Sequence, residues 1–152
     1  MPSARPFRRV AIIGLGLMGG SLGLAIKRKK LSQIVVGYAR RARMRRQALA
    51  AGVVDEAFAR PELAVRDADF VIFCVPVGVI PGLVKLCASS LSDRAVVTDV
   101  GSIKAEIVAQ AEPVVAGVSW PGWTRASAPS SSANCGLPAS HFAPPPPCRR
   151  PR

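Results

Sequence analysis

The stretch Arg9-Val10-Ala11-Ile12-Ile13-Gly14-Leu15-Gly16-Leu17-Met18-Gly19 carries the clearest indication of fold in this 152-residue chain. Its first part is rich in β-branched residues and ends in glycine, which is typical of a strand buried on both faces of a parallel sheet. The residues from Met18 to about Lys30 read as a helix, because the cations at 27–30 complement the negative end of a helix dipole. We therefore predict a strand, a glycine-rich turn and a helix.

Strands and helices alternate along the residues that follow. We expect a strand at 34–38, a helix from about 41 to 51 that stops at Gly52, a connecting segment, a short helix from 61 to about 66, a strand at 69–75, a helix within 79–90, a strand at 95–99, a helix at 103–112 and a strand at 114–118. Strands that alternate with helices imply right-handed crossovers and a parallel sheet. The predicted fold class is α/β with a doubly wound parallel sheet.

The segment Gly14-Leu15-Gly16-Leu17-Met18-Gly19 follows the pattern G-x-G-x-x-G. The pattern alone is weak evidence, but here it follows a predicted strand and opens a predicted helix. In that setting Gly14 makes the tight turn, Gly16 lets a pyrophosphate approach the backbone, and Gly19 lets helix and strand pack closely. The N–H groups at the helix start attract phosphates. We predict a Rossmann-type dinucleotide-binding turn at 14–19; a glycine-rich turn without a ligand is the alternative.

The residue that selects NAD or NADP is expected about 20 residues after the glycines, at the end of the second strand. That position is Ala39, so no acid is available there to bind a ribose 2′-hydroxyl. The arginines that follow it are Arg40, Arg41, Arg43, Arg45 and Arg46. Cations at a helix N-terminus oppose the dipole, which favours an anionic partner. We predict NADP, with Arg40 and Arg41 binding its 2′-phosphate; a solvated basic surface without influence on cofactor choice is the alternative.

Charge and composition divide the chain. It has 21 Lys and Arg against 9 Asp and Glu, a formal net charge of +12, and all the acids lie between Asp55 and Glu112. Residues 118–152 are rich in Pro and Ser, contain the run 144–147 of four prolines, and are expected to be disordered. A basic patch attracts nucleic acid non-specifically, but no recognition motif accompanies it, so no specific nucleic-acid partner is expected.

Two apolar runs raise the question of a membrane segment. Val10–Ile26 is interrupted by glycines, and no small-residue cleavage site follows it. Phe70–Val84 contains Pro76 and Pro81 and is shorter than the roughly 18–20 residues that span a bilayer. The four cysteines, at 74, 87, 135 and 148, form no C-x-x-C pair. We expect no membrane segment, no metal site and a cytoplasmic location.

Several segments together resemble the prephenate/arogenate dehydrogenase family of tyrosine biosynthesis. They are Val10–Ser21 (VAIIGLGLMGGS), Val36–Tyr38 with the later AGVVDE at 51–56, Asp67–Asp69 leading into CVPVG at 74–78, and TDVGSIK at 98–104. The resemblance covers residues from about 8 to 116. Each segment taken singly also resembles other small Rossmann dehydrogenases and reductases. Such an enzyme, or a non-catalytic dinucleotide-binding module, is the alternative.

The resemblance implies oxidative decarboxylation of prephenate or arogenate, with hydride transfer from the substrate ring to the nicotinamide of NAD or NADP. It implies that the backbone of Val75-Pro76-Val77, at the carboxyl end of a strand, lies beside the cofactor. It also implies a catalytic role for Ser102, near the nicotinamide and the substrate hydroxyl. The same serine suits the N-cap of the helix expected at 103–112, and both roles are compatible. Family members form homodimers.

The chain departs from the family pattern in three places. The family has Asp where this chain has Ala39, and it has Gly-Gly-His-Pro, whose histidine is the general base, where this chain reads AGVSWPGW at 116–123. His141 lies in the Pro-rich segment and is not assigned that role. The helical second domain of the family, which supplies substrate-binding arginines and dimer contacts, has no counterpart in 118–152.

These departures lead to an expectation about domains. We expect a dinucleotide-binding domain at 8–117 and a frameshifted or misassembled segment at 118–152. Because the expected histidine and the helical second domain are missing, we expect this chain to be inactive by itself. A natural short dinucleotide-binding protein is one alternative. A Pro-rich segment that docks into the aromatic-lined groove of a partner is another.

Overall fold

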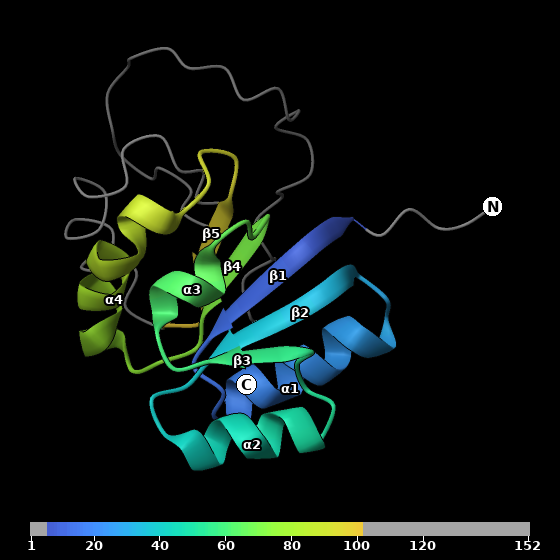
Figure 1. Ribbon diagram of the computed structural model, residues 1–152. Coiled ribbons are helices and arrows are strands. Elements are labelled where there is room, and N and C mark those ends of the chain that lie inside the picture. Colours follow the sequence, from blue (N-terminus) through green and yellow to red (C-terminus); the bar gives the residue numbers. More distant parts are fainter. Residues whose placement is uncertain (1–5, 102–152) are drawn as a thin grey trace, which may run out of the picture.

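The computed structural model describes residues 6–101 (Figure 1). The elements are β1 (Phe7–Ile13), α1 (Leu17–Arg28), β2 (Ser32–Tyr38), α2 (Ala42–Ala50), β3 (Glu56–Phe58), α3 (Pro61–Val65), β4 (Phe70–Phe73), the 3-10 helix η1 (Val77–Val79), α4 (Ile80–Cys87), the 3-10 helix η2 (Ala88–Ser90) and β5 (Val96–Asp99). The expectations for 103–112, 114–118 and the Pro-rich segment lie outside the described residues.

The strands form one five-stranded sheet in the order β3-β2-β1-β4-β5, and every neighbouring pair is parallel. The chain starts at the centre, moves outward through β2 to β3, and returns across β1 to build β4 and β5. Such a reversal of strand order beside the first strand is the hallmark of a doubly wound sheet. The predicted α/β fold class is confirmed.

Helices cover both faces of this sheet (Figure 1). On one face Ile26 of α1 and Ala48 of α2 share a core cluster with Val10 and Ile12 of β1. On the other face α3 and α4 pack on the alternate residues of β1, among them Ile13. Successive side chains of a strand point to opposite faces, so β1 serves both clusters. The prediction of a first strand buried on both faces is confirmed.

Two local predictions need correction. The segment after Gly52 was expected to be only a connection, yet 56–58 forms the edge strand β3, paired with β2 through Val36 and Glu56. A three-residue strand is too short to show a pattern of alternating residues in the sequence. It is recognised only in the structure, by its pairing with β2. Helix α1 ends at Arg28 and not near Lys30, because Lys30 adopts a left-handed φ of 53°.

The carboxylate of Asp55 connects the segment before β3 with the end of α1 and with β2. The N–H of Val35 in β2 donates a 2.8 Å hydrogen bond to Asp55 Oδ2, and Lys27 Nζ from the end of α1 lies 2.6 Å from Asp55 Oδ1. Burial by itself raises the pKa of Asp55, but the hydrogen bonds from Lys27 and Val35 and the charge of Lys27 outweigh it, and the pKa is lowered. Asp55 therefore holds α1 against β2 in its charged form.

Candidate dinucleotide-binding site

The turn after β1 requires glycine at its first position. Gly14 has a φ of +108°, and a Cβ atom there would lie against the carbonyl of Cys74 and 2.7 Å from Val75 Cγ1. A Cβ atom on Gly19 would in turn collide with the carbonyl of Gly14. Gly14 therefore lets the turn lie against the segment after β4, and Gly19 lets α1 lie close to the turn and to β1. The roles predicted for them, a tight turn and close packing, agree with this geometry.

The middle of the turn is open. Gly16 is the N-cap of α1, and a Cβ atom placed on it would find no atom within 4 Å. Beyond it, the side chains of Leu17 and Met18 are 89% and 57% exposed, whereas Leu15 is only 5% exposed and packs against Gly37. Any ligand contact at Leu15 would therefore involve its backbone. The first turn of α1 contains no acidic residue, so its N-terminal N–H groups and free space fit a pyrophosphate.

A second turn, between β2 and α2, lies beside the first. The N–H of Gly14 donates to the carbonyl of Tyr38 over 2.9 Å, and the N–H of Ala39 donates to the carbonyl of Phe58 in β3 over 3.3 Å. Ala39 is 7% exposed, and its small side chain lies in the core cluster that α1 and α2 cover. The two residues after it are exposed arginines, and Arg41 is the N-cap of α2.

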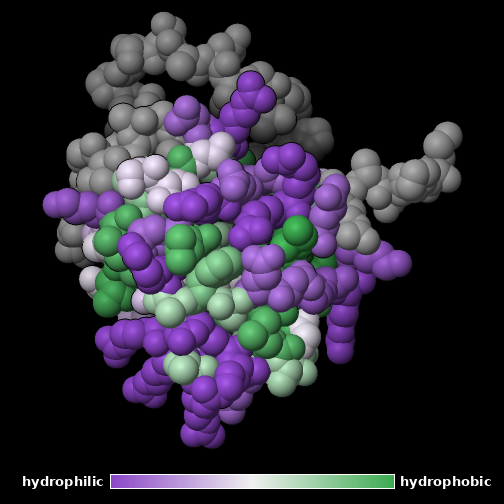
Figure 2. Space-filling view, in the orientation of Figure 1, coloured by the Kyte–Doolittle hydropathy of each residue, from purple (hydrophilic) through white to green (hydrophobic). Residues whose placement is uncertain are grey.

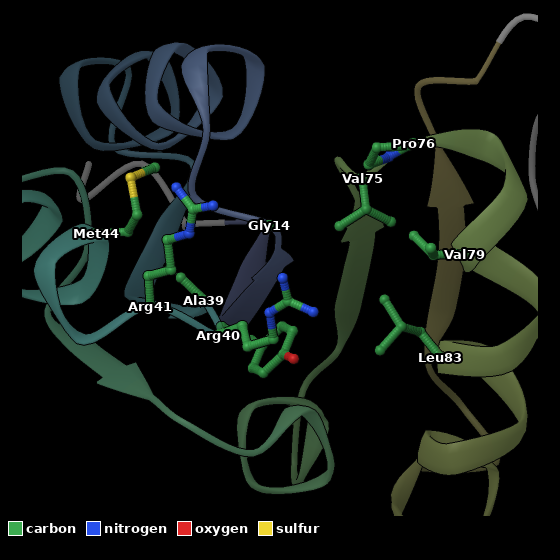
Figure 3. A pocket seen from close by; sticks show the side chains of 10 residues that line it. Gly14, Ala39, Arg40, Arg41, Met44, Val75, Pro76, Val79 and Leu83 are labelled. Carbon is green, nitrogen blue, oxygen red and sulfur yellow. The ribbon is translucent and has the colours of Figure 1, made fainter.

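A cleft of about 530 Å³ lies between these turns and the segment after β4 (Figure 3). Its lining residues are Gly14, Tyr38, Ala39, Arg40, Arg41, Met44, Val75, Pro76, Val79 and Leu83. In Figure 3, Arg41 extends toward the glycine turn, and Arg40 extends into the gap that faces Val75 and Leu83. The cleft thus has a basic wall formed by the β2–α2 turn and an apolar wall formed by α4 and its approach.

The cleft brings together part of the predicted site. Gly14, Ala39, Arg40, Arg41, Val75 and Pro76 line it, as expected for one binding site. Leu15, Gly16, Leu17, Met18 and Gly19 belong to the adjoining turn and the start of α1, and Val77 begins η1 next to Pro76. Ser102 lies outside the described residues.

Sequence reasoning missed Tyr38, Met44, Val79 and Leu83, which also line the cleft. Met44 lies three residues after Arg41, and positions three apart on a helix share a face, so helix periodicity offered a signal for it. Leu83 offered no such signal, because its place depends on how α4 packs beside β4. Its neighbours on α4, Ile80 and Val84, are fully buried in the core cluster.

The surface around α2 is strongly hydrophilic. Figure 2 shows hydrophilic side chains over this helix at the bottom of the view, in agreement with its arginine-rich sequence. Within residues 6–101, no helix is both long and apolar enough to cross a membrane. In the same range no three His, Cys, Asp or Glu side chains gather as a metal site would require.

The two cysteines among the described residues are the half-buried Cys74, just after β4, and the buried Cys87 of α4. The N–H of Cys74 continues the β1–β4 pairing with a 2.8 Å hydrogen bond to the carbonyl of Ile13. Burial raises the pKa of the Cys74 thiol to about 11. Cys87, fully buried in α4, has its pKa raised to about 12 by burial and by the negative charge of Glu62. Both thiols are therefore protonated at neutral pH, which favours structural roles.

Known proteins share this domain. The family profile described as prephenate dehydrogenase, nucleotide-binding domain, matches residues 22–120. A prephenate dehydrogenase of Lactococcus lactis subsp. cremoris is 34% identical over 113 residues, an alignment that covers 72% of this chain and 31% of that protein. Overall, the chain spans about a third of the length of the curated relatives it matches.

Solved structures of prephenate and arogenate dehydrogenases are also similar to this chain. The chain is similar to the prephenate dehydrogenase from A. aeolicus in complex with hydroxyphenyl propionate and NAD+, with 29% identity, a TM-score of 0.66, and coverage of 72% of this chain and 38% of that one. It is similar to a Synechocystis arogenate dehydrogenase with 29% identity, a TM-score of 0.67 and the same coverages. The chain therefore belongs to the prephenate dehydrogenase family, of which it contains the nucleotide-binding domain.

Proposed function

We propose that this domain binds NADP, with the pyrophosphate at the start of α1 and the ribose 2′-phosphate at Arg40 and Arg41. The observation that carries the proposal is that both arginines line the same cleft as Gly14, while the uncharged Ala39 occupies the place of a ribose-binding acid. A carboxylate there would repel a 2′-phosphate, whereas guanidinium groups bind phosphate through charge-assisted hydrogen bonds. The proposed preference for NADP therefore depends on two features, the absence of an acid at Ala39 and the presence of Arg40 and Arg41 after it.

The cleft also suits the rest of an adenosine. Val79 and Leu83 on one side and Met44 on the other offer apolar contact for a flat ring. Arg40 extends into the gap opposite Leu83, where its planar guanidinium can stack on an aromatic base (Figure 3). Arg41 extends toward the glycine turn, nearer the site proposed for the phosphates. We assign the 2′-phosphate to both arginines, and contact with the face of the base to Arg40 as well.

For the whole protein we propose NADP-dependent oxidative decarboxylation of prephenate or arogenate. The relatives named above support this substrate class. When bound, the cofactor supplies a hydride acceptor for the substrate ring. The chain's own contribution is to orient the nicotinamide end through the backbone at 75–77, after β4, and through Ser102, which we place near the substrate hydroxyl. We propose residues 8–117 as the extent of the dinucleotide-binding domain.

A second candidate function is a dinucleotide-binding chain without turnover. The observation that favours it is the sequence AGVSWPGW at 116–123, which lacks the histidine expected of a general base. The two candidates differ in one assay, the reduction of NADP in the presence of prephenate or arogenate. We expect no turnover from the 152-residue chain; measurable turnover would exclude the second candidate.

Calorimetric titration of the 152-residue chain with NADPH and with NADH tests cofactor choice. We expect NADPH to bind at least about tenfold more tightly, the effect of one charge-assisted phosphate contact. Arg41→Met should remove most of that difference and Arg43→Met, exposed on the same helix, should preserve it. Tighter binding of NADH by the unchanged chain would contradict the proposal.

A further inference from the structure

Arg45, in the first turn of α2, reaches back to the turn that carries Arg40 and Arg41. Its Nη1 donates hydrogen bonds to the carbonyl of Ala39 over 2.7 Å and to the carbonyl of Arg40 over 3.0 Å. Arg45 is half-buried and does not line the cleft. Arg46 on the same helix is exposed and makes no hydrogen bond or ion pair within residues 6–101. Arg45 is therefore tied to the proposed site through the backbone.

The two carbonyls that Arg45 binds precede the first hydrogen bonds of α2. The carbonyl of Arg41 already accepts the N–H groups of Met44 and Arg45, over 3.1 and 3.3 Å. The carbonyls of Arg40 and Ala39 lie one and two residues earlier, and both accept hydrogen bonds from the same guanidinium nitrogen of Arg45. Without that cation, their negative ends would stand next to the place proposed for a phosphate. The charge of Arg45 offsets them, and its hydrogen bonds fix the backbone from which Arg40 and Arg41 project.

The opposite side of this turn is fixed by the sheet. The N–H of Ala39 is bonded to the carbonyl of Phe58, and the carbonyl of Tyr38 accepts the N–H of Gly14. Backbone hydrogen bonds therefore hold the start of the turn, at Tyr38 and Ala39. The side chain of Arg45 holds the carbonyls of Ala39 and Arg40. Recognition of a multiply charged phosphate depends on such preorganisation, because mobile arginines lose side-chain entropy on binding.

We propose that Arg45 is a positioning residue for cofactor selection: it orients Arg40 and Arg41 toward a 2′-phosphate without touching the nucleotide. This inference rests on the proposed function of the cleft. It divides the five arginines between positions 40 and 46 into two that contact the ligand, one that positions them, and two, Arg43 and Arg46, that are exposed to solvent. A merely structural role for Arg45 would affect both cofactors equally. A positioning role affects the phosphorylated cofactor selectively.

The test compares Arg45→Met with Arg46→Met in the 152-residue chain. Each substitution removes one positive charge, and the two positions are adjacent in the sequence. We expect Arg45→Met to weaken NADPH binding about tenfold and to leave NADH binding within about twofold. Arg46→Met should leave both within about twofold, because charge at an exposed position is screened at physiological salt. Equal weakening of both cofactors, or no weakening of either, would overturn the inference.

Two further measurements keep the result interpretable. If Arg45→Met does not fold, as judged by its melting temperature, Arg45→Gln retains a neutral donor and is expected to show the same selective loss. Arg45→Lys retains the cation and is expected to recover most of the NADPH affinity. A wild-type chain that does not prefer NADPH refutes the proposed cofactor choice and this inference together. A wild-type preference that Arg41→Met removes and neither Arg45→Met nor Arg45→Gln changes refutes this inference alone.

Discussion

The backbone N–H of Gly14 donates a 2.9 Å hydrogen bond to the carbonyl of Tyr38, which joins the first glycine of the β1–α1 turn to the last residue of β2. The two loops that this bond holds together have different tasks in the proposed site. The glycine turn offers helix N–H groups to a pyrophosphate, and the residues after Tyr38 select the ribose substituent. Their fixed separation allows one nucleotide to reach both.

The first prediction concerns the left-handed turn itself. Gly14→Ala forces a side chain into a φ of +108° and against the Cys74 carbonyl, so we expect the free energy of unfolding to fall by about 2 kcal/mol or more. Gly20→Ala is the matched control, because a Cβ atom at that helical position finds nothing within 4 Å. It should stabilise the chain by about 0.5–1 kcal/mol. Urea unfolding monitored by circular dichroism measures both; equal effects would contradict the geometry.

A second substitution separates binding from folding. Gly16→Ser places a side chain in open space at the N-cap of α1, where serine is favoured, so the free energy of unfolding should stay equal or rise slightly. The same side chain occupies the space through which a pyrophosphate approaches, so NADPH affinity should fall about tenfold or more. Calorimetry and thermal melting on one sample measure the two effects. Unchanged affinity would place the phosphates elsewhere.

The sequence predicts the centre of this fold better than its edge. β1 is recognisable because Val10 and Ile13 belong to an uninterrupted apolar run, which a buried parallel strand requires. β3 is not, because Glu-Ala-Phe at 56–58 has neither the length nor the β-branched residues of a strand and forms through pairing with β2. Edge strands are decided by tertiary context.

The candidate site divides in the same way. Gly14 and Arg41 are predictable because motif spacing places them at the carboxyl ends of adjacent strands. Val79 and Leu83 are not, because their contribution depends on how α4 lies against the sheet. The tie from Arg45 to the carbonyl of Ala39 is likewise a property of side-chain conformation, which residue spacing does not reveal.

The third prediction concerns pH and Asp55. The fold lowers its pKa, so the stabilisation by its charged form is complete above the unfolded value, about 4, and is lost as the pH falls through the lower folded value. Because its side chain is 40% exposed, Asp55→Asn should cost about 1 kcal/mol or less at neutral pH. The difference from wild type should shrink as the pH falls below about 4.

Urea unfolding between pH 7 and about pH 2 measures this difference. Asp93→Asn is the control, since Asp93 is exposed and makes no hydrogen bond or ion pair among the described residues. Asp93→Asn should change the free energy of unfolding only slightly at every pH in this range. An Asp55→Asn effect that persists unchanged at the acidic end would show that the charge of Asp55 does not stabilise the fold.

A fourth prediction concerns the half-buried thiol of Cys74 and the buried thiol of Cys87. With Cys135 and Cys148 replaced by serine, the remaining Cys74 and Cys87 have pKa values of about 11 and about 12. Since the thiolate is the nucleophile, reaction with a disulfide reagent near pH 8 should be at least about a hundredfold slower than for a free thiol of pKa about 8.5. The same variant unfolded in guanidinium should react at the ordinary rate. Fast reaction in the folded state would contradict the raised pKa values of the two thiols.

The most direct test of the account is to titrate the isotope-labelled 152-residue chain with NADPH and to map changes in backbone amide resonances. We expect the largest changes at Gly14–Gly19, at Ala39–Arg41 and at Val75, and smaller changes at Arg40 and Arg41 when NADH replaces NADPH. Changes centred on another basic segment, such as Lys27–Lys30, or identical patterns for the two cofactors, would contradict it.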